Sequence, residues 1–350
     1  MNFEWLNISV AKYDETARRA AIDRQAQLTK PPGALGELET LAINLAAMQG
    51  KITPNIDHIH IGIFAADHGI AANGVSAFPQ AVTTEMVKNF ANGGAAINVL
   101  AKSLNANLSV TNVGTLFDPG PLANVIDQRI TPGTKDFSHQ AAMTKEQLHQ
   151  ALNIGRQTAE RAEKEGADLF IGGEMGIGNT TSATAIACAI LNKTPEELTG
   201  RGTGLDDAGL QHKINVLKTS LEKHQNIHDN VVQVLRHYGG FEIAALTGSF
   251  LACAKMGLPV LVDGFIATTA ALCASKTCEG SSDWFFYAHV SAESGHRIIL
   301  EALNAKPLLN LGMRLGEGSG AAVAVPLLQM ACRLHNEMAT FDEAGVSNKD

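Results

Sequence analysis

Short apolar runs recur along the chain, and each leads into a cluster of glycine or polar residues. The runs occupy residues 59–65, 108–113, 168–171, 258–262, 284–287 and 307–313. They contain many β-branched or aromatic residues and show no alternation of apolar and polar positions. This pattern predicts strands that are buried on both faces of a sheet. The glycine and polar clusters would then mark the carboxyl ends of the strands.

Longer segments with helical periodicity lie between these runs. They cover residues 82–102, 144–166, 180–191, 206–224 and 242–255. Thr144 and Gln147 form a candidate capping box for the second of them. Alternation of strands and helices predicts an α/β fold, with a doubly wound, mostly parallel Rossmann-like sheet and helices on both faces. Ligands of such sheets bind beyond the carboxyl ends of the strands, so we expect the glycine clusters to share one site.

The two ends of the chain have a different pattern. Residues 15–49 are helical apart from a break at residues 30–33, and residues 321–338 form one long helix. We therefore expect an α/β catalytic domain over residues 55–320. Residues 1–54 and 321–350 would form a small helical domain.

Composition narrows the class of protein. The chain has 350 residues, of which 45% are hydrophobic and 18% charged, as expected for a globular protein with an ample core. The net charge is −8 and no basic run occurs, so nucleic-acid binding has little support. No secretory signal is recognisable, and no apolar run reaches the roughly 20 residues that a membrane span needs. The five cysteines form no C-x-x-C pair, which indicates free thiols in a reducing cytoplasm.

A single carboxylate, Glu317, stands among glycines near the end of the chain, in the segment Gly316-Glu317-Gly318-Ser319-Gly320. Flanking glycines let the backbone turn sharply and let a ligand approach closely. No Lys or Arg lies within two residues of Glu317. A catalytic base can be presented in this way, although a simple turn explains the pattern nearly as well.

A glycine-rich loop, residues 172–182, joins a predicted strand to a predicted helix. Backbone N–H groups at a helix start bind anions, and Asn179, Thr180 and Thr181 offer further donors. The spacing matches neither the dinucleotide fingerprint nor the Walker A loop. Phosphate binding and a tight capped turn are therefore both open at this point.

Other clusters also allow two interpretations. Residues 199–207 form a second glycine-rich loop, and Lys213 follows about two turns into the next helix; this could equally be a linker with a solvated lysine. Asp263 ends a buried strand, where it could bind ribose hydroxyls or cap a helix. Ser291 could supply a hydroxyl or cap the following helix.

The pair Asp67-His68 invites a metal or acid–base interpretation. The pair is weak evidence, because adjacent residues on a strand point to opposite faces. The sequence has no Cys/His cluster of the kind that structural zinc sites use, so we expect no metal. It also lacks a G-x-S-x-G elbow, which leaves hydrolase chemistry of that kind unsupported.

Together these clusters resemble the nicotinate-nucleotide–dimethylbenzimidazole phosphoribosyltransferase family of cobalamin nucleotide-loop assembly. The matching segments run in order over nearly the whole chain: residues 28–36, 66–69, 173–181, 239–242, 258–265, 289–295 and 313–321. The resemblance implies transfer of the 5-phosphoribosyl group from nicotinate mononucleotide to 5,6-dimethylbenzimidazole or a related base. The products would be α-ribazole 5′-phosphate and nicotinate, and no cofactor is implied.

The resemblance also implies roles for individual residues. Glu317 matches the general base of the family. The nucleotide contacts match Glu174, Gly176, Gly178, Asn179, Gly202, Thr203, Lys213, Asp263, Gly264, Ser291 and Gly316. The base pocket is implied at residues 75–80 and 83–86, which include Phe78, Gln80 and Met86. Purine or phenolic acceptors remain conceivable, and the family is homodimeric with a site near the subunit interface.

The implied chemistry explains why one carboxylate could suffice. A pyridinium leaving group departs as a neutral ring and needs no general acid, whereas the incoming benzimidazole nitrogen must lose a proton. A glycosidase, which protonates its leaving group, needs two paired carboxylates. Shielding from water would raise the pKa of Glu317 toward the working pH. Two alternatives remain: a nicotinamide-dependent oxidoreductase, and a nucleotide sensor without catalytic activity.

Overall fold

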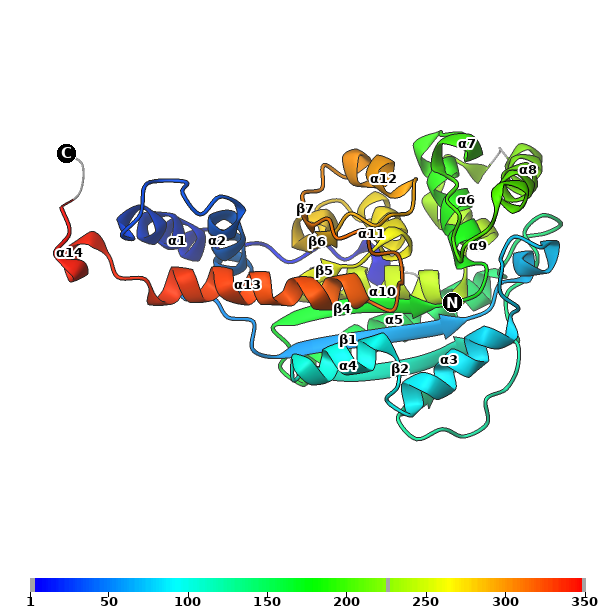
Figure 1. The fold of residues 1–350 in the computed structure, drawn as a ribbon, viewed down its shortest axis with the longest axis horizontal. Helices are drawn as coiled ribbons and strands as arrows, with labels where there is room; N and C mark the ends of the chain where they lie inside the picture. Colours follow the sequence, from blue (N-terminus) through cyan, green and yellow to red (C-terminus); the bar gives the residue numbers. More distant parts are fainter. Residues whose placement is uncertain (1–3, 225–226, 348–350) are drawn as a thin grey trace.

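The computed structural model describes residues 4–224 and 227–347, and within them the chain forms one parallel sheet of seven strands (Figure 1). The strand order is β3-β2-β1-β4-β5-β6-β7. The strands are β1 (Ile59–Ala66), β2 (Asn107–Gly114), β3 (Val125–Asp127), β4 (Leu169–Met175), β5 (Val260–Val262), β6 (Phe285–His289) and β7 (Pro307–Leu309). The order of the sheet reverses between β1 and β4, as in doubly wound folds. The predicted α/β fold is confirmed.

Helices cover both faces of the sheet (Figure 1). One face carries α5 (Lys145–Lys164), α10 (Phe241–Met256) and α11 (Phe265–Thr277). The other carries α3 (Ala81–Ala91), α4 (Ala96–Ser103) and the first half of α13 (Ser319–Glu337). Helices α5 and α10 can approach closely because Gly155 on α5 has no side chain. A Cβ atom there would lie 1.8 Å from the carbonyl oxygen of Ala245 on α10. Such close packing suits a chain that is rich in glycine and alanine.

The N-terminal helices lie against the far half of α13, beyond the sheet (Figure 1). These helices are α1 (Glu15–Gln27) and α2 (Glu37–Gln49), and the break between them is closed by an ion pair of 2.9 Å between Lys30 Nζ and Glu39 Oε1. Leu28 forms an isolated β-bridge with Thr340, just before α14 (Phe341–Ala344). The two ends of the chain therefore meet, as expected, while the division into two domains stays a prediction.

The structure corrects one predicted helix and adds one strand. Residues 82–102 form two helices, α3 and α4, because Gly93 and Gly94 interrupt them and Gly93 is left-handed with φ of +77°. The short edge strand β3 has no counterpart among the predicted runs, since its three residues are half-buried or exposed. The capping box of α5 is confirmed: Gln147 N donates to Thr144 Oγ1 at 3.2 Å, and Thr144 N donates to Gln147 Oε1 at 2.8 Å.

The remaining helices connect these layers. They are α6 (Asn179–Leu191), α7 (Pro195–Leu198), α8 (Asp207–Lys223), α9 (Val231–Tyr238), α12 (His296–Ala302), and the 3₁₀ turns η1 (Glu4–Asn7), η2 (Gly69–Asn73) and η4 (Ser281–Trp284). All five cysteines are free thiols, and only Cys278 is not buried. Across the described ranges, no helix has both the length and the hydropathy needed to cross a bilayer.

Candidate active site

A cavity of about 390 Å³ lies at the carboxyl ends of the central strands, beside the reversal of strand order. Loops that follow β4, β5, β6 and β7 form its walls, together with part of α3. Most of the predicted site residues line it: Phe78, Met86, Glu174, Gly176, Asn179, Gly202, Thr203, Asp263, Gly264, Ser291, Gly316 and Glu317. The structure therefore brings these separate clusters together, as the single-site prediction requires.

Three predicted residues do not line the cavity. Gly178 turns toward the loop after β1, where a Cβ atom would lie 3.1 Å from Ala71 Cβ. The Gln80 side chain points away, because its Nε2 donates to the carbonyl oxygen of His68 at 2.9 Å. Lys213 lies behind the wall.

Lys213 is fully buried, so the interpretation as a solvated lysine is wrong. Its Nζ donates to Thr180 Oγ1 at 2.8 Å and to the carbonyl oxygen of Gly200 at 3.4 Å. Burial lowers the pKa of this amine to about 8, against a smaller upward effect of the Glu293 carboxylate. The lysine thus places a positive charge directly behind the start of α6.

Glu317 lies over the middle of the sheet, although β7 is at its edge. Gly316, Glu317 and Gly318 follow one another in the left-handed region, with φ of +85°, +63° and +77°. This conformation costs a residue with a Cβ atom about 1–2 kcal/mol, so the surrounding structure must hold it. The backbone crosses β4 so closely that a Cβ atom at Gly173 would lie 2.6 Å from the carbonyl carbon of Glu317.

Glu317 is 5% exposed, and its carboxylate faces the start of α4. The backbone N–H of Ile97 donates to its Oε2 at 3.3 Å. Burial raises the pKa of Glu317, the hydrogen bond from Ile97 opposes the shift, and the charge of Asp263 adds to it. The predicted upward shift is therefore present.

Glu174 lies at the carboxyl end of β4, next to the loop that carries Glu317, and is 6% exposed. Asn179 Nδ2 donates to its Oε2. Burial, followed by the charges of Glu242 and Asp263, raises the pKa of Glu174 to about 8. The carboxyl group is therefore mostly protonated at neutral pH. Glu317 is isolated along the chain but not in space, since Glu174 and Asp263 share its cavity.

Asp263 caps a helix, but not the one that follows it. Its Oδ1 accepts a hydrogen bond of 2.8 Å from the backbone N–H of Ala321, in the first turn of α13. His289 Nε2 lies 3.6 Å from the same oxygen. Ser291 lines the cavity and does not cap the following helix: its Oγ accepts from Glu293 N at 3.3 Å, and α12 begins after Gly295 without a side-chain cap.

The second glycine-rich loop joins the two sides of the cavity. Thr203 Oγ1 lies 3.0 Å from Ser76 Oγ and accepts from Ala77 N at 3.1 Å. Arg314 Nη1 donates to the carbonyl oxygen of Gly202 at 3.2 Å. Arg314, His289 and Glu293 were not predicted to line the cavity. Their positions could have indicated them, since His289 ends β6, and Glu293 and Arg314 lie in the loops that follow β6 and β7.

An apolar wall faces the glycine loop of β4. It consists of Phe78, Val82 and Met86, from the segment that leads into α3 and from α3 itself. Such a wall suits a flat aromatic ligand.

The Asp67 and His68 side chains are committed to protein contacts. Asp67 Oδ1 accepts from Thr83 Oγ1 at 2.7 Å, and His68 Nε2 lies 2.5 Å from Glu242 Oε1. Within residues 4–224 and 227–347, no group of three His, Cys, Asp or Glu side chains is arranged to hold a metal ion.

Comparison with known proteins shows which class this fold and site define. The family model described as "Phosphoribosyltransferase" matches residues 10–346. The class is therefore that of phosphoribosyltransferases, which are glycosyltransferase-type enzymes.

The individual relatives identify the family within this class. The chain is 53% identical to the nicotinate-nucleotide–dimethylbenzimidazole phosphoribosyltransferase of Xanthomonas oryzae pv. oryzae, over 99% of this chain and 100% of the relative. It is 51% identical to the enzyme of that name from Pseudomonas aeruginosa, over 100% of this chain and 99% of the relative. A crystal structure of CobT from Thermus thermophilus superposes with a TM-score of 0.91 at 44% identity, covering 95% of this chain and 100% of that one. The chain belongs to the nicotinate-nucleotide–dimethylbenzimidazole phosphoribosyltransferase family, as its motifs predict. These comparisons support neither the oxidoreductase nor the sensor alternative.

Proposed function

We propose that this enzyme transfers the 5-phosphoribosyl group of nicotinate mononucleotide to 5,6-dimethylbenzimidazole or a related base, with Glu317 as the general base. The products are α-ribazole 5′-phosphate and nicotinate. The observation that carries the proposal is the placement of Glu317: a buried carboxylate, held in a left-handed turn between glycines, with its pKa raised by burial.

Of the helix starts that line the cavity, that of α6 is the best suited to a phosphate, because the start of α11 comes directly after the Asp263 carboxylate. Gly178, its N-cap residue, provides no side-chain cap, and the charge of Lys213 lies just behind Thr180. The start of α13 is already occupied, because Asp263 accepts the N–H of Ala321. We therefore assign the phosphoribosyl group to the β4 side of the cavity, with Gly176 and Asn179 closest to it.

The other predicted contacts surround the ribose in this assignment. Gly264 and Ser291 lie on the far wall, and Gly202 and Thr203 close the site from the second glycine loop. Glu174, mostly protonated at neutral pH, can donate a hydrogen bond to a ribose or phosphate oxygen.

The acceptor base then lies against the apolar wall of Phe78, Val82 and Met86. In this proposal Glu317, which lines the same cavity, removes the proton from the attacking nitrogen. The nicotinate ring leaves as a neutral pyridine, so its departure needs no acid. Binding of the phosphate away from the reacting carbon supplies energy that can be used at C1′.

The test is nicotinate release from nicotinate mononucleotide, measured with and without a panel of benzimidazoles, purines and phenols. Release only in the presence of an acceptor, together with a new α-glycosidic product, would support the proposal. Release without any acceptor would indicate a hydrolase, and no release with any base would refute the transfer reaction. The ranking of bases would also identify the preferred acceptor.

The family resemblance extends this proposal to assembly and location. We propose a homodimer that works in the cytoplasm, with the cavity near the subunit interface. Phe78, which belongs to the apolar wall, is 52% exposed, and this exposure supports a partner surface there. Light scattering of the purified protein would report a monomer if this is wrong.

A further inference from the structure

The segment Ala66-Asp67-His68-Gly69 has no role in the proposed reaction, yet Asp67 is fully buried beside the cavity. Each oxygen of its carboxylate holds a different element. Oδ1 accepts from Thr83 Oγ1 at 2.7 Å, on α3, and Oδ2 accepts from Leu116 N at 2.7 Å, in the loop after β2. Hydrogen bonds to a charged group are stronger than neutral ones, so this carboxylate fixes both elements to the end of β1.

The Thr83 hydroxyl continues the connection into the opposite wall. It donates to Asp67 and also accepts a hydrogen bond of 3.1 Å from the backbone N–H of Ile177. Ile177 belongs to the glycine loop after β4 and lines the cavity. One buried hydroxyl therefore links the helix that carries the acceptor wall to the loop assigned to the phosphoribosyl group.

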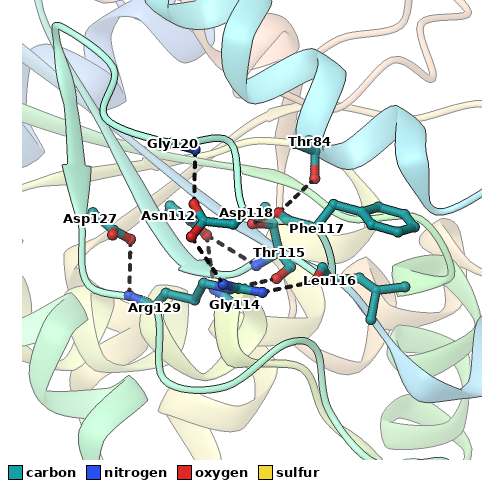
Figure 2. A network of polar contacts seen from close by, with 10 residues as sticks. All are labelled: Thr84, Asn112, Gly114, Thr115, Leu116, Phe117, Asp118, Gly120, Asp127 and Arg129. Atoms are coloured by element: carbon teal, nitrogen blue, oxygen red, sulfur yellow. Dashed lines mark hydrogen bonds and ion pairs between the residues drawn. The ribbon is translucent and has the colours of Figure 1, made fainter.

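The loop after β2 is itself held in place, so Asp67 is tied to a fixed support. Figure 2 shows Arg129 Nε and Nη2 donating to the carbonyl oxygens of Thr115 and Leu116, each at 2.8 Å. It also shows Thr84 Oγ1 donating to the carbonyl oxygen of Phe117 at 3.1 Å. The first turn of α3 is thus attached on two sides by neighbouring threonines.

Thr83 lies on α3 between two residues of the apolar wall, so its hydrogen bonds affect where that wall lies. Val82 precedes Thr83 and Met86 lies one turn later, and both side chains line the apolar wall. A change in the link between Thr83 and Ile177 would move this wall relative to the glycine loop. For two bound reactants, a misplacement of about 1 Å can cost roughly 100-fold in rate.

We propose that Asp67 and Thr83 are positioning residues, which set the distance between the acceptor base and the phosphoribosyl group through the chain Asp67–Thr83–Ile177. The inference rests on the proposed function for the identity of the two reactants. It goes beyond that function by assigning a coupling role to residues that do not line the cavity.

The test uses Thr83→Val, which keeps the shape of the side chain and removes the hydroxyl. We expect kcat to fall roughly 10- to 100-fold, because the two reactants lose their alignment. The Kd of nicotinate mononucleotide, measured by calorimetry, should change less than about threefold, because each half of the site stays intact. Thr83→Ser retains the hydroxyl and should recover kcat to within about threefold of the wild-type enzyme.

Thr158→Val is the matched control. Thr158 is equally buried, but its hydroxyl donates only to the carbonyl oxygen of Ile154 in its own helix, α5, at 3.0 Å. Wild-type kinetics are expected for this variant. A kcat of Thr83→Val within twofold of the wild type would overturn the proposal, and so would equal losses in Thr83→Ser or Thr158→Val.

Amide hydrogen exchange supplies a readout that does not depend on catalysis. The Ile177 amide should be protected in the wild-type protein and exchange faster in Thr83→Val, but not in Thr158→Val. A wild-type Ile177 amide that exchanges like an exposed loop overturns the link even if Thr83→Val does not fold. If Thr83→Val does not fold, Asp67→Asn replaces it as the test variant. The same result is expected, a lower kcat with a nearly unchanged Kd for nicotinate mononucleotide. A wild-type protein that transfers no phosphoribosyl group would refute the proposed function alone, since the exchange data would still decide the link.

Discussion

Two glycine-rich segments approach each other in the cavity: the carboxyl end of β4 with the loop that follows it, and the loop after β7. Each carries a glutamate a few residues before a helix. The loops interlock: a Cβ atom at Gly316 would lie 2.4 Å from Glu174 Oε1, and one at Gly173 would lie 2.6 Å from Glu317 C. Along the chain the two loops look alike. In the structure their glutamates have different surroundings.

The two glutamates differ in backbone conformation and in the groups that shift the pKa of each carboxyl group. Glu174 is an extended strand residue whose pKa is raised to about 8 by burial and neighbouring carboxylates. Glu317 is in a left-handed turn, and a backbone N–H from α4 opposes the upward shift of its pKa. Similar motifs can thus supply a neutral hydrogen-bond donor and a basic carboxylate, because environment rather than residue type sets the protonation state.

The largest effect should come from the β7 loop. Glu317→Gln removes the basic carboxylate and keeps the shape, so we expect kcat to fall by about 10²–10⁴-fold. Calorimetry should show nearly unchanged binding of nicotinate mononucleotide. Turnover within a few-fold of the wild type would exclude Glu317 as the base.

The contact between the loops is tested by Gly173→Ala. The added Cβ atom would collide with the Glu317 backbone, and we expect roughly 100-fold lower kcat together with a stability loss of about 1–3 kcal/mol. Turnover and urea unfolding would be measured on the same preparation. A stable variant with wild-type turnover would show that Glu317 can shift without consequence.

Substitution of Glu174 should change turnover less than substitution of Glu317, and should mainly change how stability depends on pH. At pH 7 the amide of Glu174→Gln resembles the protonated acid, so we expect turnover within about fivefold of the wild type. The folded protein holds a proton on Glu174 up to a pKa of about 8, whereas the unfolded chain releases it near 4.5. The stability that the protonated Glu174 gives to the folded wild-type protein is therefore fully present below pH 4.5, and it is lost as the pH rises to 8.

Glu174→Gln has no carboxyl group to ionise at this position, so it does not lose this stability as the pH rises. Its Tm should therefore rise relative to that of the wild type between pH 5 and pH 8.5. Thermal unfolding at the two pH values measures the difference. Parallel Tm curves for the two proteins would mean that Glu174 is ionised in the folded state, and the contrast with Glu317 would disappear.

The smallest effect is expected at the start of α13, which Asp263 caps. Asp263→Asn keeps an oxygen that can accept from Ala321 N but removes the charge, which should cost at most about 1 kcal/mol at the start of α13. Urea unfolding measures it. A loss above about 3 kcal/mol would show that the carboxylate supports more of the fold than this one helix start.

Much of the fold was predictable because the strands are continuous apolar runs and the helices are long and periodic. The exceptions have local physical causes: Gly93 and Gly94 divide one helix, and β3 is too short and too exposed to show a pattern. Most site residues were also predictable, since they follow strand ends that parallel topology brings to one edge. Gln80 and Lys213 were placed less well, because a side chain near a site can turn toward His68 or be buried behind Thr180.

The sequence by itself determined the α/β class, the family and the candidate base, because these depend on periodicity and on motifs that are local in the chain. Only the tertiary structure decided that Glu317 shares its cavity with Glu174 and Asp263, and that Asp67 connects both sides of the site. Those contacts join residues far apart in sequence, and the pKa of a carboxyl group depends on the burial and charges that folding brings around it.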